Sequence, residues 1–194
     1  SRKTMGNLLK RLAKAGVTKT DAILDFGCGN GMFVQFLQKR GYADVTGYDP
    51  YVEQFAAAAD SSAFDCVVAN DVIEHIPDPR ATVRACAGYL KPGGLLYIGV
   101  PESAGVEMDN LEPHMMRLHQ PFHRVIFTEE TLKRLGHDAG LELVDSYRRS
   151  YLDTKAPFAN YRFLDEFNKA FDYNMDKALD PASAKILGRR PRLL

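Results

Sequence analysis

A short apolar segment followed at once by three closely spaced glycines is the feature that most constrains this chain. Residues 22–26 form the apolar run expected of a buried strand, and Gly27, Gly29 and Gly31 come next, before an amphipathic stretch over 31–40. A strand, a glycine loop and a helix in this order present free backbone N–H groups to a ligand at the carboxyl edge of a parallel sheet. Many glycine turns bind nothing, so the loop alone is a weak signal.

The rest of the chain continues the alternation of strands and helices. Further strands are expected over residues 45–48, 64–69, 95–100 and 141–147. Helices are expected over residues 1–19, 31–40, 51–59, 129–139 and 160–179, with one more opened by Asp78 and Pro79 and a turn at 92–94. This order predicts an α/β fold, a doubly wound, mainly parallel sheet with helices on both faces.

The composition fits one soluble domain over residues 1–194, with an N-terminal helix over 1–19, a lid or substrate segment over 101–127 and a C-terminal helix over 160–179. Lys and Arg total 25, as do Asp and Glu, and this zero balance favours neither a nucleic acid nor a membrane surface as a partner. The three cysteines have no CxxC spacing, which predicts reduced thiols, no zinc site and a cytoplasmic location.

The spacing of the glycines and the position of one acidic residue narrow the choice of ligand. A dinucleotide fingerprint would need glycine at position 32, where the chain has Met32. Asp49 ends the second predicted strand, 18 residues after Gly31. A carboxylate there can accept hydrogen bonds from both hydroxyls of a ribose. The alternative is that Asp49 is only a turn residue before Pro50.

Four segments between residues 23 and 101 together carry a resemblance to a known family: ILDFGCGNG, VTGYDP, FDCVVANDVIEHIPDP and LKPGGLLYIGVP. They resemble class I S-adenosylmethionine-dependent methyltransferases, especially the small-molecule branch similar to ubiquinone-biosynthesis O-methyltransferases. Residues 119–147 also resemble this branch. The resemblance implies a Rossmann-like methyltransferase fold, S-adenosylmethionine as cofactor and a small-molecule acceptor, most simply at a hydroxyl oxygen.

Carried over by motif, the cofactor-binding candidates are Asp25, Gly27, Cys28, Gly29, Asp49, Pro50, Tyr51, Asn70 and Asp71. Tyr51 could lie against adenine or be an ordinary surface residue. The chain departs from the family between residues 51 and 63, which are too few for the helix, strand and helix usually found there. The third-strand region is therefore shortened, and the acidic residue that often contacts adenine has no clear counterpart.

Methyl transfer from a sulfonium needs positioning more than it needs a metal, and none is expected here. An acceptor hydroxyl must lose a proton, and His123 is the predicted base, with His119 as its alternate. Either histidine could instead be structural. Two other functions remain open: a noncatalytic binding module with this fold, and an NAD-binding oxidoreductase.

Overall fold

The computed structural model describes residues 2–57, 61–103, 105–107, 109–110 and 123–148. Arg2 and Thr4–Tyr147 belong to one compact unit, and residues 148–194 belong to a second. The predicted helix at 160–179 and His119 lie outside the described residues, and the single-domain organisation stays a prediction.

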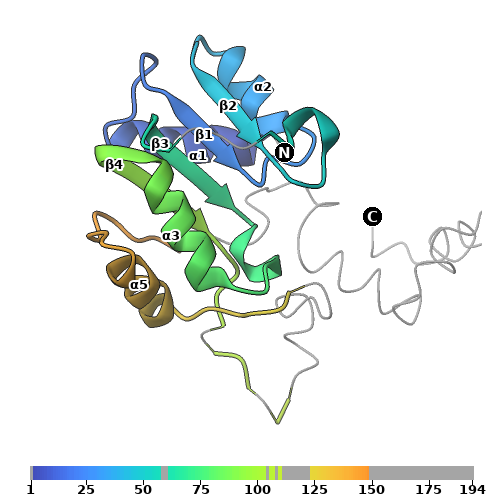
Figure 1. Ribbon diagram of the computed structural model, residues 1–194. Coiled ribbons are helices and arrows are strands. Elements are labelled where there is room, and N and C mark those ends of the chain that lie inside the picture. Colours follow the sequence, from blue (N-terminus) through green and yellow to red (C-terminus); the bar gives the residue numbers. More distant parts are fainter. Residues whose placement is uncertain (1, 58–60, 104, 108, 111–122, 149–194) are drawn as a thin grey trace, which may run out of the picture. The chain divides into compact units, whose positions relative to one another are not determined.

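A four-stranded parallel sheet forms the centre of the first unit (Figure 1). Its order is β2-β1-β3-β4, and every neighbouring pair is parallel. The strands are β1 (Ile23–Phe26), β2 (Val45–Tyr48), β3 (Phe64–Asn70) and β4 (Leu90–Gly99). Because the chain starts at β1, steps to β2 and then crosses to β3, the carboxyl ends of β1, β2 and β3 meet where the strand order reverses, which is the ligand-binding edge of such sheets.

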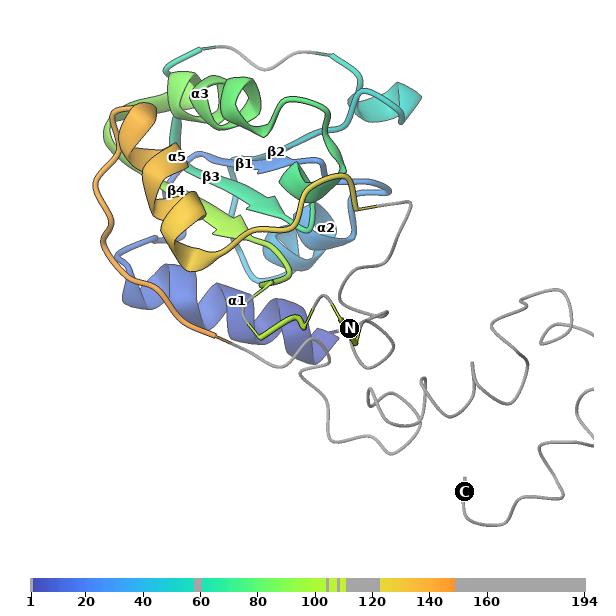
Figure 2. The same cartoon turned by 90° about the horizontal axis from the view of Figure 1, so that it is seen from below.

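Helices cover both faces of the sheet, as predicted (Figure 2). On one face, α1 (Arg2–Lys14) and α2 (Met32–Gln38) pack Leu12 and Leu37 against Ile23 and Cys66. On the other face lie α3 (Pro79–Tyr89) and α5 (Glu129–Asp138). The side chains of neighbouring residues in a strand alternate between these two layers, which is why the strands read as continuous apolar runs.

Several predicted elements differ from the structure. The segment over 141–147 is irregular instead of a strand, since Leu143 is 60% and Val144 is 73% exposed and no described residue pairs with them. The predicted helix at 51–59 is only a short 3-10 turn, Glu53–Phe55. The carbonyl oxygen of Phe55 accepts the Asp49 N–H at 2.9 Å, which folds this segment back onto the end of β2.

The bounds of two predicted elements also differ from those in the structure. Residues 92–94 are part of β4 instead of a separate turn, although the register of β3 and β4 jumps between Phe64 and Cys66. The first helix ends at Lys14, and Gly16 follows it with a left-handed φ of 102°. The three cysteines are free thiols, as expected. Among the described residues, no helix is long and apolar enough to cross a membrane.

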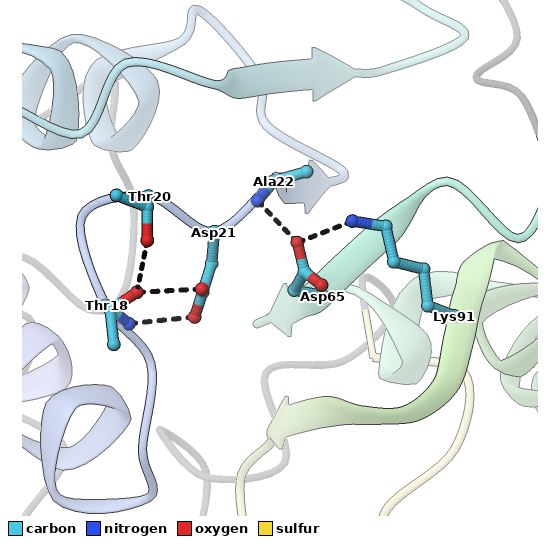
Figure 3. A network of polar contacts seen from close by, with 6 residues as sticks. All are labelled: Thr18, Thr20, Asp21, Ala22, Asp65 and Lys91. Atoms are coloured by element: carbon cyan, nitrogen blue, oxygen red, sulfur yellow. Dashed lines mark hydrogen bonds and ion pairs between the residues drawn. The ribbon is translucent and has the colours of Figure 1, made fainter.

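A polar network fastens the amino ends of the strands, opposite the glycine loop (Figure 3). The Asp65 carboxylate accepts the Ala22 N–H and the Lys91 ammonium, both at 2.8 Å, and so links β1, β3 and β4. The hydrogen bond from Lys91 is the main cause of the lowered pKa of Asp65. The contribution of Asp65 to stability is therefore present above its unfolded pKa and is lost as pH falls through its lower folded pKa.

Asp78 caps α3 as the sequence predicts, because its carboxylate accepts the Ala81 N–H at 2.9 Å. We expect Asp78→Ala to lower the free energy of unfolding by about 1 kcal/mol, since an N–H at the helix start loses its partner. Urea unfolding followed by circular dichroism measures this. Asp44→Ala, at an exposed position outside any helix, is the control. Equal midpoints for the two variants would contradict the cap.

Candidate active site

Backbone hydrogen bonds hold the glycine loop against the end of β2. The N–H groups of Gly27 and Cys28 both donate to the Tyr48 carbonyl oxygen, at 2.7 and 3.1 Å. Gly27, Gly29 and Gly31 all have a left-handed φ, of 75°, 53° and 74°. Side chains other than glycine rarely adopt this conformation, so the sequence repeat reflects a backbone requirement at all three positions.

The space around these glycines differs, and the difference locates where a ligand can approach. A Cβ atom at Gly27 would lie 2.5 Å from the Val72 side chain, and one at Gly31 would lie 2.6 Å from Phe55. A Cβ atom at Gly29 would meet no heavy atom of the described residues within 4 Å. Gly27 and Gly31 are therefore packed against protein, whereas the middle of the loop faces open space.

Asp49 is bonded to this loop by its side chain. One carboxylate oxygen accepts the Gly29 N–H at 2.9 Å, and the other accepts the Tyr51 N–H at 3.0 Å. The turn role considered for Asp49 is thus present in the structure, and each carboxylate oxygen keeps capacity for a further hydrogen bond. Pro50 is exposed beside it, and Tyr51 is 94% exposed, so its ring is available for stacking.

Asp25 lies in β1 directly before the loop and is 6% exposed. Burial first, and then the charge of Asp49, raise the pKa of Asp25 to about 7. The same two causes act on Cys28 in the loop: burial first, followed by the charges of Asp25 and Asp49, raise the pKa of its thiol to about 11. Cys28 is therefore a thiol at neutral pH and a poor nucleophile.

Asn70 and Asp71 stand at the carboxyl end of β3. Asp71 has an unusual left-handed φ of 57°, and its N–H donates to the Gly99 carbonyl oxygen at 2.7 Å. The Asn70 side-chain amide donates to the Asp71 carboxylate at 2.7 Å. A non-glycine residue in this conformation carries a local energetic cost, which is a frequent property of functional positions.

His123 lies beside His75 and Glu74, two residues that follow β3. The sequence predicts a structural or cofactor-proximal role for His75, next to Glu74, and assigns none to Glu74. The ring of His123 lies edge-on to that of His75, with centroids 4.9 Å apart, and the N–H groups of Arg124 and Val125 donate to the Glu74 carbonyl oxygen. The Nε2 atom of His75 is 3.9 Å from a carboxylate oxygen of Glu74. An acidic residue between Ile73 and His75 was the signal available in the sequence.

Glu74 is an unusual buried acid. Its side chain is 1% exposed, and neither carboxylate oxygen has a hydrogen-bond partner among the described residues. Burial is the main cause that raises the pKa of Glu74 to about 7. The ligating atoms of Glu74, His75 and His123 lie within 4.8 Å of one another, near enough for these side chains to share a proton or a cation.

The chain belongs to the methyltransferase domain family, whose model matches residues 2–146. This places it in the class I S-adenosylmethionine-dependent methyltransferases. It is similar to the ubiquinone biosynthesis O-methyltransferase of Cronobacter sakazakii, at 34% identity over 43% of this chain and 44% of that protein. The protein of the same name from Neisseria meningitidis serogroup C is 28% identical over 66% of this chain and 67% of its own length.

Solved structures confirm the fold. The 1,6-didemethyltoxoflavin-N1-methyltransferase of Burkholderia thailandensis, solved with its substrate and S-adenosylhomocysteine, aligns with a TM-score of 0.56 at 22% identity, covering 76% of this chain and 70% of that one. The [4+2]-cyclase SpnF aligns with a TM-score of 0.57 at 21% identity, covering 74% and 58%. Because the names of these two proteins describe different reactions, the fold alone does not define the chemistry.

The glycine loop yields a paired prediction. Gly29→Val should lose cofactor binding, because the branched side chain would fill the open space in front of the loop, and the left-handed φ of 53° at this position should cost some stability without a collision. Gly27→Val should lower stability further, since its side chain would also collide with Val72. Thermal unfolding and calorimetric titration with S-adenosylhomocysteine separate the two effects. Normal binding by a folded Gly29→Val variant would contradict a close approach of ligand to backbone.

Proposed function

We propose that this protein transfers a methyl group from S-adenosylmethionine to a hydroxyl oxygen of a small molecule. The observation that carries the proposal is the open face of Gly29 beside two carboxylates, Asp25 and Asp49. These groups suit a ligand that combines ribose hydroxyls with cationic groups. His123 and Glu74 contribute a second set of titratable groups after β3.

The residues proposed to hold the cofactor have distinct tasks. Asp49 accepts from ribose hydroxyls while fixing the loop, and Tyr51 offers an exposed ring to adenine. The loop of Gly27, Cys28 and Gly29 admits the methionine part, with Asp25 behind it. Asn70 and Asp71 line the same edge at the end of β3, and Pro50 restricts the backbone of Asp49, the residue before it. When bound, S-adenosylmethionine supplies a methyl group on a positively charged sulfur.

The acceptor side of the proposal rests on His123. An imidazole has an ordinary pKa of about 6.5, which suits removal of a hydroxyl proton near neutrality. The carboxyl group of Glu74 lies close enough to offset the charge that His123 would gain. His119 stays the alternate base. A noncatalytic binding module and an NAD-binding oxidoreductase are the competing functions, and each makes a different ligand-binding prediction.

Calorimetric titration tests the cofactor. We expect S-adenosylmethionine and S-adenosylhomocysteine to bind and NADH not to bind. Asp49→Ala should weaken binding by roughly 1–3 kcal/mol, because ligand groups and two backbone N–H groups lose their acceptor. Asp44→Ala is the matched control, since it removes an exposed carboxylate at the other end of β2. Tight NADH binding without S-adenosylhomocysteine binding would overturn the proposal.

Catalysis by His123 is tested with His123→Gln. Phenols and alcohols are offered as methyl acceptors, and the formation of S-adenosylhomocysteine from S-adenosylmethionine is measured. If His123 is the base, the variant should bind cofactor normally and lose ~10²–10⁴-fold in kcat when chemistry limits turnover. His137→Gln, on the exposed side of α5, is the control. Product formed by wild type also excludes the noncatalytic module.

A structural role for His123 has a different signature. If His123 only holds its segment against Glu74, His123→Gln should lose thermal stability and acceptor affinity together. Unchanged kcat at saturating acceptor would remove His123 from the mechanism. The same test then applies to His119, and unchanged kcat in both variants would leave positioning as the source of catalysis.

A further inference from the structure

Two acidic side chains, Asp25 and Asp49, converge on the glycine loop, and no cationic side chain among the described residues forms an ion pair with either. Asp25 lies before the loop and Asp49 is bonded to its centre at Gly29. A ligand that enters beside Gly29 therefore meets negative charge that the described residues leave uncompensated.

The described residues around Asp25 are mostly apolar. Its register partners are Gly47 on β2 and Val68 on β3, which do not titrate. The buried residues that α1 and α2 contribute to this side of the sheet are apolar: Leu8, Leu12, Phe36 and Leu37. Among the described residues, the charge that acts on Asp25 is that of Asp49, and the pKa of the neighbouring Cys28 thiol is in turn raised by Asp25. The protonation of Asp25 therefore depends on burial, on Asp49 and on whatever binds at the loop.

We propose that Asp25 releases a proton to solvent when the cofactor binds, so that cofactor affinity depends on pH through this one buried carboxyl group. The inference rests on the proposed function, because it takes S-adenosylmethionine as the ligand. In the free protein, burial and Asp49 favour the neutral acid. A ligand that carries positive charge reverses this preference, since it stabilises the carboxylate.

The charge of the ligand then determines the size of the effect. S-adenosylmethionine carries an ammonium and a sulfonium group against one carboxylate, whereas S-adenosylhomocysteine lacks the sulfonium charge. The donor should therefore ionise Asp25 more completely than the product does. By linkage, affinity for the donor rises with pH until Asp25 is ionised in the free protein. Because the affinity for the product rises less with pH, the preference for donor over product also increases toward neutrality.

Proton release is measured by calorimetric titration at pH 6.5 in phosphate and in imidazole, two buffers that differ in ionisation enthalpy. At this pH the amino group of the ligand is protonated both in the free ligand and in the complex, so it does not contribute to the proton release. With the pKa of Asp25 at about 7, wild type should release about three quarters of a proton on binding S-adenosylmethionine, and less with S-adenosylhomocysteine. Asp25→Asn should lose this release, while Asp44→Asn, an exposed control, should retain it.

The pH dependence of affinity gives a second readout. Between pH 6 and 7.5, the dissociation constant of S-adenosylmethionine should fall roughly five- to tenfold in wild type and much less in Asp25→Asn. If Asp25→Asn does not fold, carboxyl resonances of wild-type protein labelled with ¹³C-aspartate provide the same information. One of them should titrate near neutrality in the free protein and shift to lower pH when S-adenosylmethionine is present.

The outcomes separate this inference from the proposed function. Binding of S-adenosylmethionine with equal proton release in wild type and Asp25→Asn would overturn the role of Asp25 and leave the proposed function intact. The same holds if no aspartate resonance titrates near neutrality. Absence of binding for both S-adenosylmethionine and S-adenosylhomocysteine would overturn the proposed function and this inference together.

Discussion

The site depends on the way the glycine loop is bonded to the end of β2. Two loop N–H groups share the Tyr48 carbonyl oxygen, and a third, that of Gly29, reaches the Asp49 carboxylate. These bonds join segments more than 15 residues apart in sequence and hold the loop in its left-handed conformation. Without them, a loop with three closely spaced left-handed glycines would sample many conformations, at an entropic cost to the binding of any ligand.

Side chains from beyond the loop complete this arrangement. Val72 fills the space next to Gly27, and Phe55 fills the space next to Gly31 and Gly47. Val72 directly precedes the segment that carries Glu74 and His75, so the glycine loop and the segment after β3 are in physical contact. Close packing of this kind transmits small displacements, because a well-packed interior has little free volume.

Two carboxyl groups lie close in sequence to the residues of this contact, Asp25 before Gly27 and Glu74 after Val72, and burial raises the pKa of each to about 7. Desolvation is the first cause in both cases, yet their neighbours differ. Asp25 faces another acid, Asp49, whereas Glu74 lies beside two histidines. Burial of acids without hydrogen-bonded counterions is costly for folding, so their presence at one edge of the sheet fits selection for function over stability.

Local sequence was sufficient to predict the four parallel strands, the helices on both faces and the start of α3 at Asp78. These features depend on apolar periodicity and on backbone groups within a few residues, which a linear pattern records. The segment at 141–147 was predicted wrongly because its residues alternate without an apolar face, and a strand there would need a neighbour to pair with. The short turn at 53–55 likewise depends on a bond from Phe55 back to Asp49.

For the candidate site too, some features were predictable from the sequence and others only from the structure. The glycine spacing, the acid ending β2 and the residues after β3 could be assigned from motifs, because each occupies a fixed place relative to its strand. Only the tertiary structure brought His123 to Glu74 and His75, 48 or more positions earlier in the chain, and only it distinguished the open face of Gly29 from the filled ones of Gly27 and Gly31. Burial and contacts between distant segments are properties of the packed chain, and sequence spacing carries no record of them.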